Sequence, residues 1–185
     1  MKITERLPKP KQIAPVYAVV VMLLYGWTIS WILWKIPSWL YFLPVTEILG
    51  ICAYAFTVVF LESLAALLAL LVLCLALPKK WFYESFIARA STLVISLFGY
   101  LMYFSYSFKS IDTKDYPQTL ANWTPAVIVV ILLLVYVVGR VKMLSGMVEE
   151  FSSRAVVFLY ISIPVSVLCL LYIIARNIFL NLING

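Results

Sequence analysis

The chain has 185 residues, of which 65% are hydrophobic and only 12% are charged, whereas soluble domains average about 45–50% apolar and about 25% charged residues. This composition, with a mean hydropathy of +1.05, excludes a soluble globular domain and predicts an all-α integral membrane protein. Histidine is absent, which excludes an imidazole general base and the usual haem and zinc ligands.

Apolar blocks long enough to cross a bilayer follow a polar, basic arm at residues 1–12. A transmembrane helix needs about 20 mainly apolar residues. We therefore predict one transmembrane domain over residues 13–180, followed by a short tail at 181–185. Its five spans are expected at about 13–34, 45–77, 91–108, 124–144 and 155–180.

The second block, residues 45–77, is ambiguous because a helix of that length measures about 50 Å, against about 30 Å of hydrocarbon. It forms either one long span or two short spans. Whether the block is one long helix or is broken near Gly50 also stays open. Because Lys and Arg are retained on the cytoplasmic side, their distribution distinguishes one span from two. One span places ten of them on the N-terminal side and four on the other, whereas two spans give seven and seven. We therefore predict five spans with a cytoplasmic N-terminus and an outside C-terminus, in the plasma membrane.

Small and polar residues mark the faces of a span that turn toward protein. At 100° per residue, the third span places such residues on one face, opposite Leu97, Leu101 and Phe104; the fifth span carries a similar face that includes Cys169 and Arg176. The predicted polar seam consists of Thr92, Ser96, Tyr103, Ser107, Ser162 and Ser166, and Gly99 lies on its face. We expect this seam to serve helix packing, with a ligand or conduction path as the alternative. The fourth span has no such face and is expected to be the most exposed to lipid.

Glu62 lies within the second span, on a face shared with Ala55, Ala66 and Ala69. A carboxylate there costs about 2.5–3.5 kcal/mol and normally faces the bundle interior and a partner. Arg176 is the expected partner because the rise of a helix places both side chains at a similar depth. Residues 35–50 would then form a cap on the outer surface; if the helix starts deeper, Glu47 pairs with Arg176 instead. We expect a structural ion pair, with ion movement and contact with another subunit as alternatives.

Basic and aromatic residues follow the second span and are expected to contact lipid headgroups on the cytoplasmic side, either from a short interfacial helix or from an ordinary loop. These residues are Lys79, Lys80, Trp81 and Arg89. The charged runs at 109–115 and 140–154 are predicted to be solvated loops.

No HExxH, GxSxG, Walker A, CxxC or Rossmann motif is present, so no enzyme activity, cofactor or metal is predicted. Cys52, Cys74 and Cys169 lie in apolar blocks, where thiols act as small hydrophobic groups. We expect a non-catalytic multi-pass protein, an accessory or anchoring subunit of a larger membrane complex. Its expected partners are other membrane protein subunits and membrane lipids, including anionic headgroups, but no nucleic acid, since the basic residues are dispersed. The alternative is a small transporter, channel or lipid-handling protein that uses the polar seam around Glu62.

Overall fold

The structure, a computed structural model, describes residues 8–76, 85–107 and 116–184. Every regular element within these ranges is a helix, which confirms the all-α prediction. The helices are α1 (Pro10–Trp39), α2 (Val45–Ala76), α4 (Phe86–Ser107), α5 (Tyr116–Arg140), α6 (Lys142–Ala155) and α7 (Val157–Asn184). Five helical segments of the described chain are long and apolar enough to cross a membrane, namely Pro10–Trp39, Val45–Ala76, Phe86–Tyr106, Ala121–Arg140 and Lys142–Phe179.

The ends of the first and last helices differ from the predicted boundaries. α1 starts at Pro10, inside the predicted arm, because proline suits the first turn of a helix. The side-chain oxygen Oε1 of Gln12 also accepts a hydrogen bond from the backbone N–H of Lys9 at 3.1 Å, which satisfies one donor that the helix start leaves open. α7 runs to Asn184, so the predicted tail at 181–185 is almost entirely helical.

The fourth span and the segment after it also differ from prediction. α5 starts at Tyr116 and not at residue 124, because Pro117 occupies the first turn of the helix, where a missing N–H costs nothing. The charged run at 140–154 is not a solvated loop but largely the helix α6. Ser152 and Ala155 of α6 are buried and lie three residues apart, on one face of the helix.

α2 is one continuous helix of 32 residues through Gly50. A break near Gly50 is therefore excluded, and the second block forms one long helix that is apolar enough to cross a membrane. Glu47 lies in the first turn of α2, and α1 extends to Trp39. The expected surface cap over residues 35–50 is therefore wrong, because only residues 40–44 lie between the two helices.

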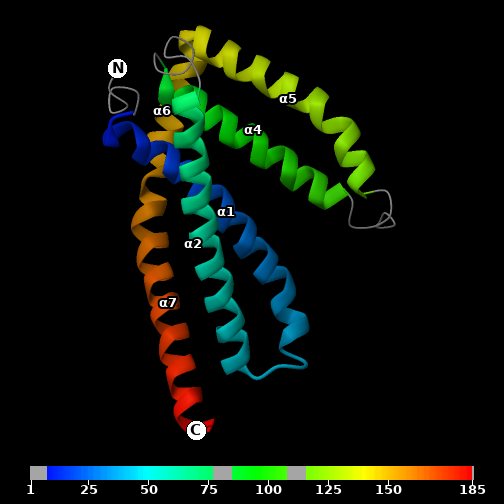
Figure 1. Cartoon of the computed structure of the whole chain (residues 1–185), viewed down its shortest axis with the longest axis vertical. Helices are drawn as coiled ribbons and strands as arrows, with labels where there is room; N and C mark the ends of the chain where they lie inside the picture. The colour runs from blue at the N-terminus through cyan, green and yellow to red at the C-terminus, as the bar shows by residue number, and fades with distance from the viewer. Residues whose placement is uncertain (1–7, 77–84, 108–115, 185) are drawn as a thin grey trace.

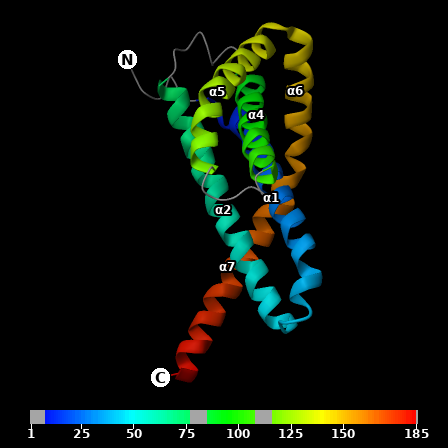
Figure 2. The same ribbon diagram turned by 90° about the vertical axis from the view of Figure 1, so that its right-hand side faces the viewer.

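α1 is the central helix, since it packs against α2, α4, α6 and α7. Its β-branched run supplies the most deeply buried side chains, among them Val16, Val19, Val20 and Val21. Figure 1 shows α2 and α7 running beside α1, while the hairpin of α4 and α5 diverges from α2 like the second arm of a V. Figure 2 shows that α6 leads into α7 with a change of axis direction at their junction.

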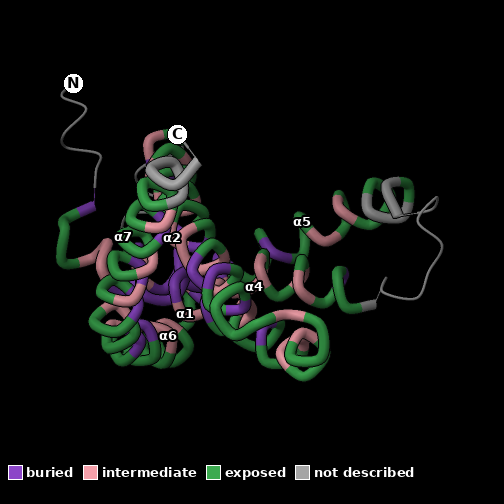
Figure 3. The backbone as a smooth tube through the Cα atoms, turned by 90° about the horizontal axis from the view of Figure 1, so that it is seen from below, coloured by how far each residue is buried: buried purple, intermediate pink, exposed green. Residues whose placement is uncertain are grey.

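The outer helices expose most of their apolar surface. Figure 3 shows buried residues gathered around α1 and exposed residues along the outer faces of the other helices. Only 17% of the most apolar 18-residue stretch of α5 is buried, and the most apolar 18-residue stretch within Lys142–Phe179 is buried to the same extent. The high exposure predicted for the fourth span is therefore observed, but the last span shares it.

Candidate functional site: an outward-facing carboxylate on α2

Glu62 lies on the exposed surface of α2 and not in the bundle interior. At 1.5 Å per residue it is about 25 Å from Val45 and about 21 Å from Ala76, so it lies close to the middle of the span. No hydrogen bond or ion pair joins its carboxylate to the residues that the structure describes; the one ion pair in that part of the chain links Arg154 to Glu150 at 2.6 Å. The predicted Glu62–Arg176 pair is therefore not formed.

Arg176 lies too far along the bundle to reach Glu62. Its guanidinium rests against Gly50, where an added Cβ would lie 2.1 Å from Nη1. Gly50 is about 18 Å from Glu62 along α2. Glu47, the alternative partner, is one turn from Gly50 but forms no ion pair with Arg176 within the described chain. The predicted depth of Arg176 was wrong because it was counted from Arg154 as the inner end of the last span. In the structure α6 (Lys142–Ala155) precedes α7 within that span, so Arg176 lies further along the bundle.

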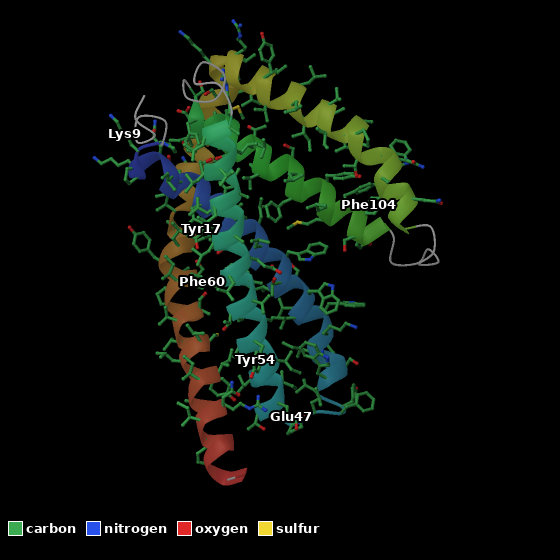
Figure 4. All side chains as sticks on the ribbon, viewed as in Figure 1. Lys9, Tyr17, Glu47, Tyr54, Phe60 and Phe104 are labelled. Atoms are coloured by element: carbon green, nitrogen blue, oxygen red, sulfur yellow. The ribbon has the colours of Figure 1, made fainter. Side chains whose placement is uncertain are left out.

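The adjacent residue explains why Glu62 points outward. Ser63 is fully buried, and its hydroxyl lies 3.1 Å from the hydroxyl of Tyr17 on α1. Successive side chains on a helix are about 100° apart, so the contact of Ser63 with α1 turns Glu62 away from that helix. Figure 4 shows Tyr17 where α1 runs beside α2.

A narrow face of α2 surrounds Glu62, and we call it the α2 seam. At 100° per residue, its members lie within about 40° of Glu62. They are Ile51, Ala55, Glu62, Ala66, Ala69 and Leu73. Three of these six residues are alanines, and small residues are enriched where transmembrane helices approach closely.

Apolar hollows lie along the seam on both sides of Glu62. Toward the α1–α2 turn, a hollow of about 390 Å³ is bounded by Ile51 and Ala55 and by tryptophans of α1, including Trp31. Toward the other end of α2, a hollow of about 320 Å³ is bounded by Ala66 and Ala69 and by residues of α4, including Leu97. The α2 seam therefore has one carboxylate near its middle and an apolar hollow on each side of it.

The α4 part of the predicted polar seam does not form a continuous polar face. Thr92 is buried and donates to the carbonyl oxygen of Ala88 at 2.7 Å, and the Ser96 hydroxyl donates to the carbonyl oxygen of Thr92. Tyr103 is 71% exposed, whereas Phe104 is only 5% exposed, the reverse of the expectation. Gly99 is exposed as well. Figure 1 shows that α4 diverges from α1 toward its C-terminal end, where α5 runs beside it, so its buried face changes. The side chain of Ser107 lies outside the described residues.

The α7 part of that seam faces a different neighbour. Ser166 is buried and shares a hydrogen bond with the Tyr25 hydroxyl of α1. Ser162 donates to the carbonyl oxygen of Phe158 at 2.7 Å. Since α1 packs against both α4 and α7, it lies between the two parts of the predicted seam. The arrangement favours helix packing over a single polar path.

Hydroxyl contacts between helices were not identified from the sequence. Besides Tyr17–Ser63 and Tyr25–Ser166, the Ser152 hydroxyl of α6 donates to Ser91 of α4 at 2.8 Å. Each serine is almost completely buried, and Ser63 and Ser166 lie within apolar stretches of the sequence. A serine within an apolar stretch could have indicated such a contact, since a buried hydroxyl in a span needs a hydrogen-bond partner.

Arg89 is not a lipid contact as predicted, because it is only 7% exposed. Its Nη2 donates to the carbonyl oxygen of Gly139 at 3.5 Å, near the C-terminal end of α5. A Cβ at Gly139 would lie 2.0 Å from Nε of Arg89. The open carbonyls and the negative end of the helix dipole of α5 account for this position of the cation. Lys79, Lys80 and Trp81 lie outside the described residues.

No group of three or more Cys, Asp or Glu residues close enough to hold a metal occurs in the described part of the chain, and the three cysteines carry free thiols. Comparison with protein family models, with curated proteins and with solved structures found no match for this chain. The candidate site therefore rests on the α2 seam and its carboxylate alone.

Proposed function

We propose that the chain is a non-catalytic accessory or anchoring subunit of a larger membrane complex, and that the α2 seam binds a transmembrane helix of its partner. The observation that carries this proposal is the position of Glu62, which is exposed near the middle of a span and has no partner among the described residues. A carboxylate in contact with lipid at that depth costs about 2.5–3.5 kcal/mol. A partner helix removes this cost.

The seam also indicates the chemistry of the partner. Ala55, Ala66 and Ala69 allow close approach of a second backbone. The partner helix carries Lys, Arg or another hydrogen-bond donor opposite Glu62. A charge-assisted hydrogen bond from that donor offsets the charge of the carboxylate where water does not reach it. A second copy of this chain does not supply that donor from the same face, where Glu62 would meet Glu62.

The proposed orientation has a cytoplasmic N-terminus in the plasma membrane. Lys9 and Lys11 lie where α1 begins, and Arg140 and Lys142 lie where α5 meets α6, at the same end of the molecule in Figure 1. Lys35 is near the opposite end. Retention of basic residues in the cytoplasm supports this orientation, in which the basic end faces anionic headgroups.

Site-specific photo-cross-linking in native membranes tests the proposal. A benzophenone side chain is placed at Val58 or Ala65, which are exposed and one turn from Glu62, and at exposed Leu133 of α5 as the matched control. We expect Val58 and Ala65 to cross-link to one membrane protein, and Leu133 to lipid only. Glu62→Leu should abolish that cross-link, whereas Glu150→Leu, a change to an exposed carboxylate of α6, should not.

Three outcomes would count against the proposal. Lipid products alone from Val58 and Ala65 would show that the seam faces the bilayer. Cross-links to a second copy of the chain would indicate a homo-oligomer. A protein cross-link that survives Glu62→Leu would show that the carboxylate does not contribute to association.

A further inference from the structure

We propose that the groove between α2 and α7 binds one phospholipid, with an acyl chain in the groove and the phosphate on Arg176. This site is independent of the α2 seam. Cys52 and Phe56, which line the groove, lie about 80–120° around α2 from Glu62 at 100° per residue. A result that refutes helix binding at the α2 seam therefore does not affect the proposed phospholipid site, and the reverse also holds.

The groove has the chemistry of an acyl-chain site. It is open along the side of the bundle, holds about 330 Å³, and is lined by apolar side chains and thiols. Leu49, Cys52 and Phe56 line it from α2, and Leu168, Cys169 and Tyr172 from α7. An acyl chain fills such a surface without leaving polar groups unpaired.

A cation marks the end of the groove nearest the α1–α2 turn. Arg176 is one turn beyond Tyr172 on α7, and its half-buried guanidinium rests against Gly50, the neighbour of Leu49. It forms no ion pair or hydrogen bond with the described residues. A guanidinium presents five N–H donors in a fixed geometry that suits phosphate, so a phosphate next to the groove compensates this charge.

Glu47 favours a zwitterionic headgroup over an anionic one. It lies one turn from Gly50, in the first turn of α2, and Figure 4 shows it at the end of that helix. Its negative charge repels an anionic headgroup and attracts an ammonium group, as found in phosphatidylethanolamine. Lys35, the other described cation near this end, lies 5.2 Å and 4.9 Å from the ring centroids of Trp31 and Trp34 on α1, and does not enter the site.

Native mass spectrometry of the full chain in detergent tests the headgroup site. Dioleoylphosphatidylethanolamine, dioleoylphosphatidylglycerol and dioleoylglycerol are titrated separately. We expect phosphatidylethanolamine to bind about tenfold more tightly than dioleoylglycerol, the equivalent of one charge-assisted hydrogen bond. Arg176→Gln should remove this difference, and Glu47→Gln should raise the affinity for phosphatidylglycerol. Arg140→Gln, which changes an exposed arginine at the opposite end, should change neither result.

Thiol protection tests the groove in the same protein. In a Cys74→Ala background, bound phosphatidylethanolamine should slow alkylation of Cys52 and Cys169, and phosphoethanolamine without acyl chains should not. Gly50→Ala, which displaces the guanidinium of Arg176, should reduce protection as Arg176→Gln does, so that a folding defect in one variant does not decide the result. Equal affinity of phosphatidylethanolamine and dioleoylglycerol for the unmodified chain would overturn the proposal. So would protection by phosphoethanolamine alone, or alkylation rates that do not respond to lipid.

Discussion

Replacement of Gly139 by alanine should destabilise the junction of α4 and α5. The added Cβ would lie 2.0 Å from Nε and 2.7 Å from Cζ of Arg89, distances that no relaxed structure retains. A flexible arginine on the surface would move aside at little cost. Arg89 is buried, however, so the guanidinium must leave its position at the C-terminal end of α5.

The size of the effect follows from three terms. Overpacking costs about 1–3 kcal/mol, and loss of a hydrogen bond from a charged group costs about 1.5–3 kcal/mol. The two costs overlap, and alanine regains up to about 1 kcal/mol over glycine within a helix. We therefore expect a net loss of about 2 kcal/mol for Gly139→Ala.

Gly146→Ala in α6 is the matched control, because a Cβ there meets nothing within 4 Å. It should be neutral or stabilising by up to about 1 kcal/mol. At roughly 2–4 °C per kcal/mol, thermal unfolding in detergent should separate the two variants by about 4–12 °C. In an Arg89→Ala background, Gly139→Ala should add no further loss. Equal unfolding temperatures for Gly139→Ala and Gly146→Ala would refute the role assigned to Arg89.

Three further predictions use the same unfolding assay. Tyr25→Phe and Ser166→Ala should each cost about 0.6 kcal/mol, the average for hydrogen bonds between transmembrane helices, and at most about 1.7 kcal/mol. The double variant should lose no more stability than either single variant; additive losses would mean that the two hydroxyls are not coupled. Gly50→Ala should destabilise the protein less than Gly139→Ala, because Arg176 beside Gly50 is half-buried and can move away; an equal or larger loss would contradict this. Phe104→Ala should cost about 3–5 kcal/mol and Tyr103→Ala less than about 0.5 kcal/mol, and the opposite order would show that the face of α4 has been assigned incorrectly.

Composition and hydropathy were sufficient to predict the fold class and the presence of five long apolar helices, because a bilayer imposes length and apolarity on each span. Helix ends were harder to place. Pro10 and Pro117 were not used as signals of a helix start, yet each lies in the first turn of a helix. Charge led to the assignment of 140–154 as a loop, although its apolar residues recur at helical spacing.

The neighbours of each helix could not be predicted from one sequence. Helical periodicity correctly grouped Glu62 with Ala55, Ala66 and Ala69, but it does not say whether that face turns inward or outward. The β-branched run Val19–Val21 resembles a span in contact with lipid, and yet α1 is the centre of the bundle. In a membrane an apolar helix surface can face either lipid or other helices, so hydropathy carries no information about which helix is central.

Thermal unfolding of the purified Glu62→Leu variant tests whether the Glu62 carboxylate is an outward-facing group without a partner in its own bundle. The carboxylate has no partner within the described bundle, so its replacement should leave the unfolding temperature of the isolated protein unchanged or raise it. Glu62→Gln should behave in the same way. A loss corresponding to about 3–5 kcal/mol, the cost of breaking a buried ion pair, would show that Glu62 is bound inside its own bundle and would contradict its assignment as an outward contact.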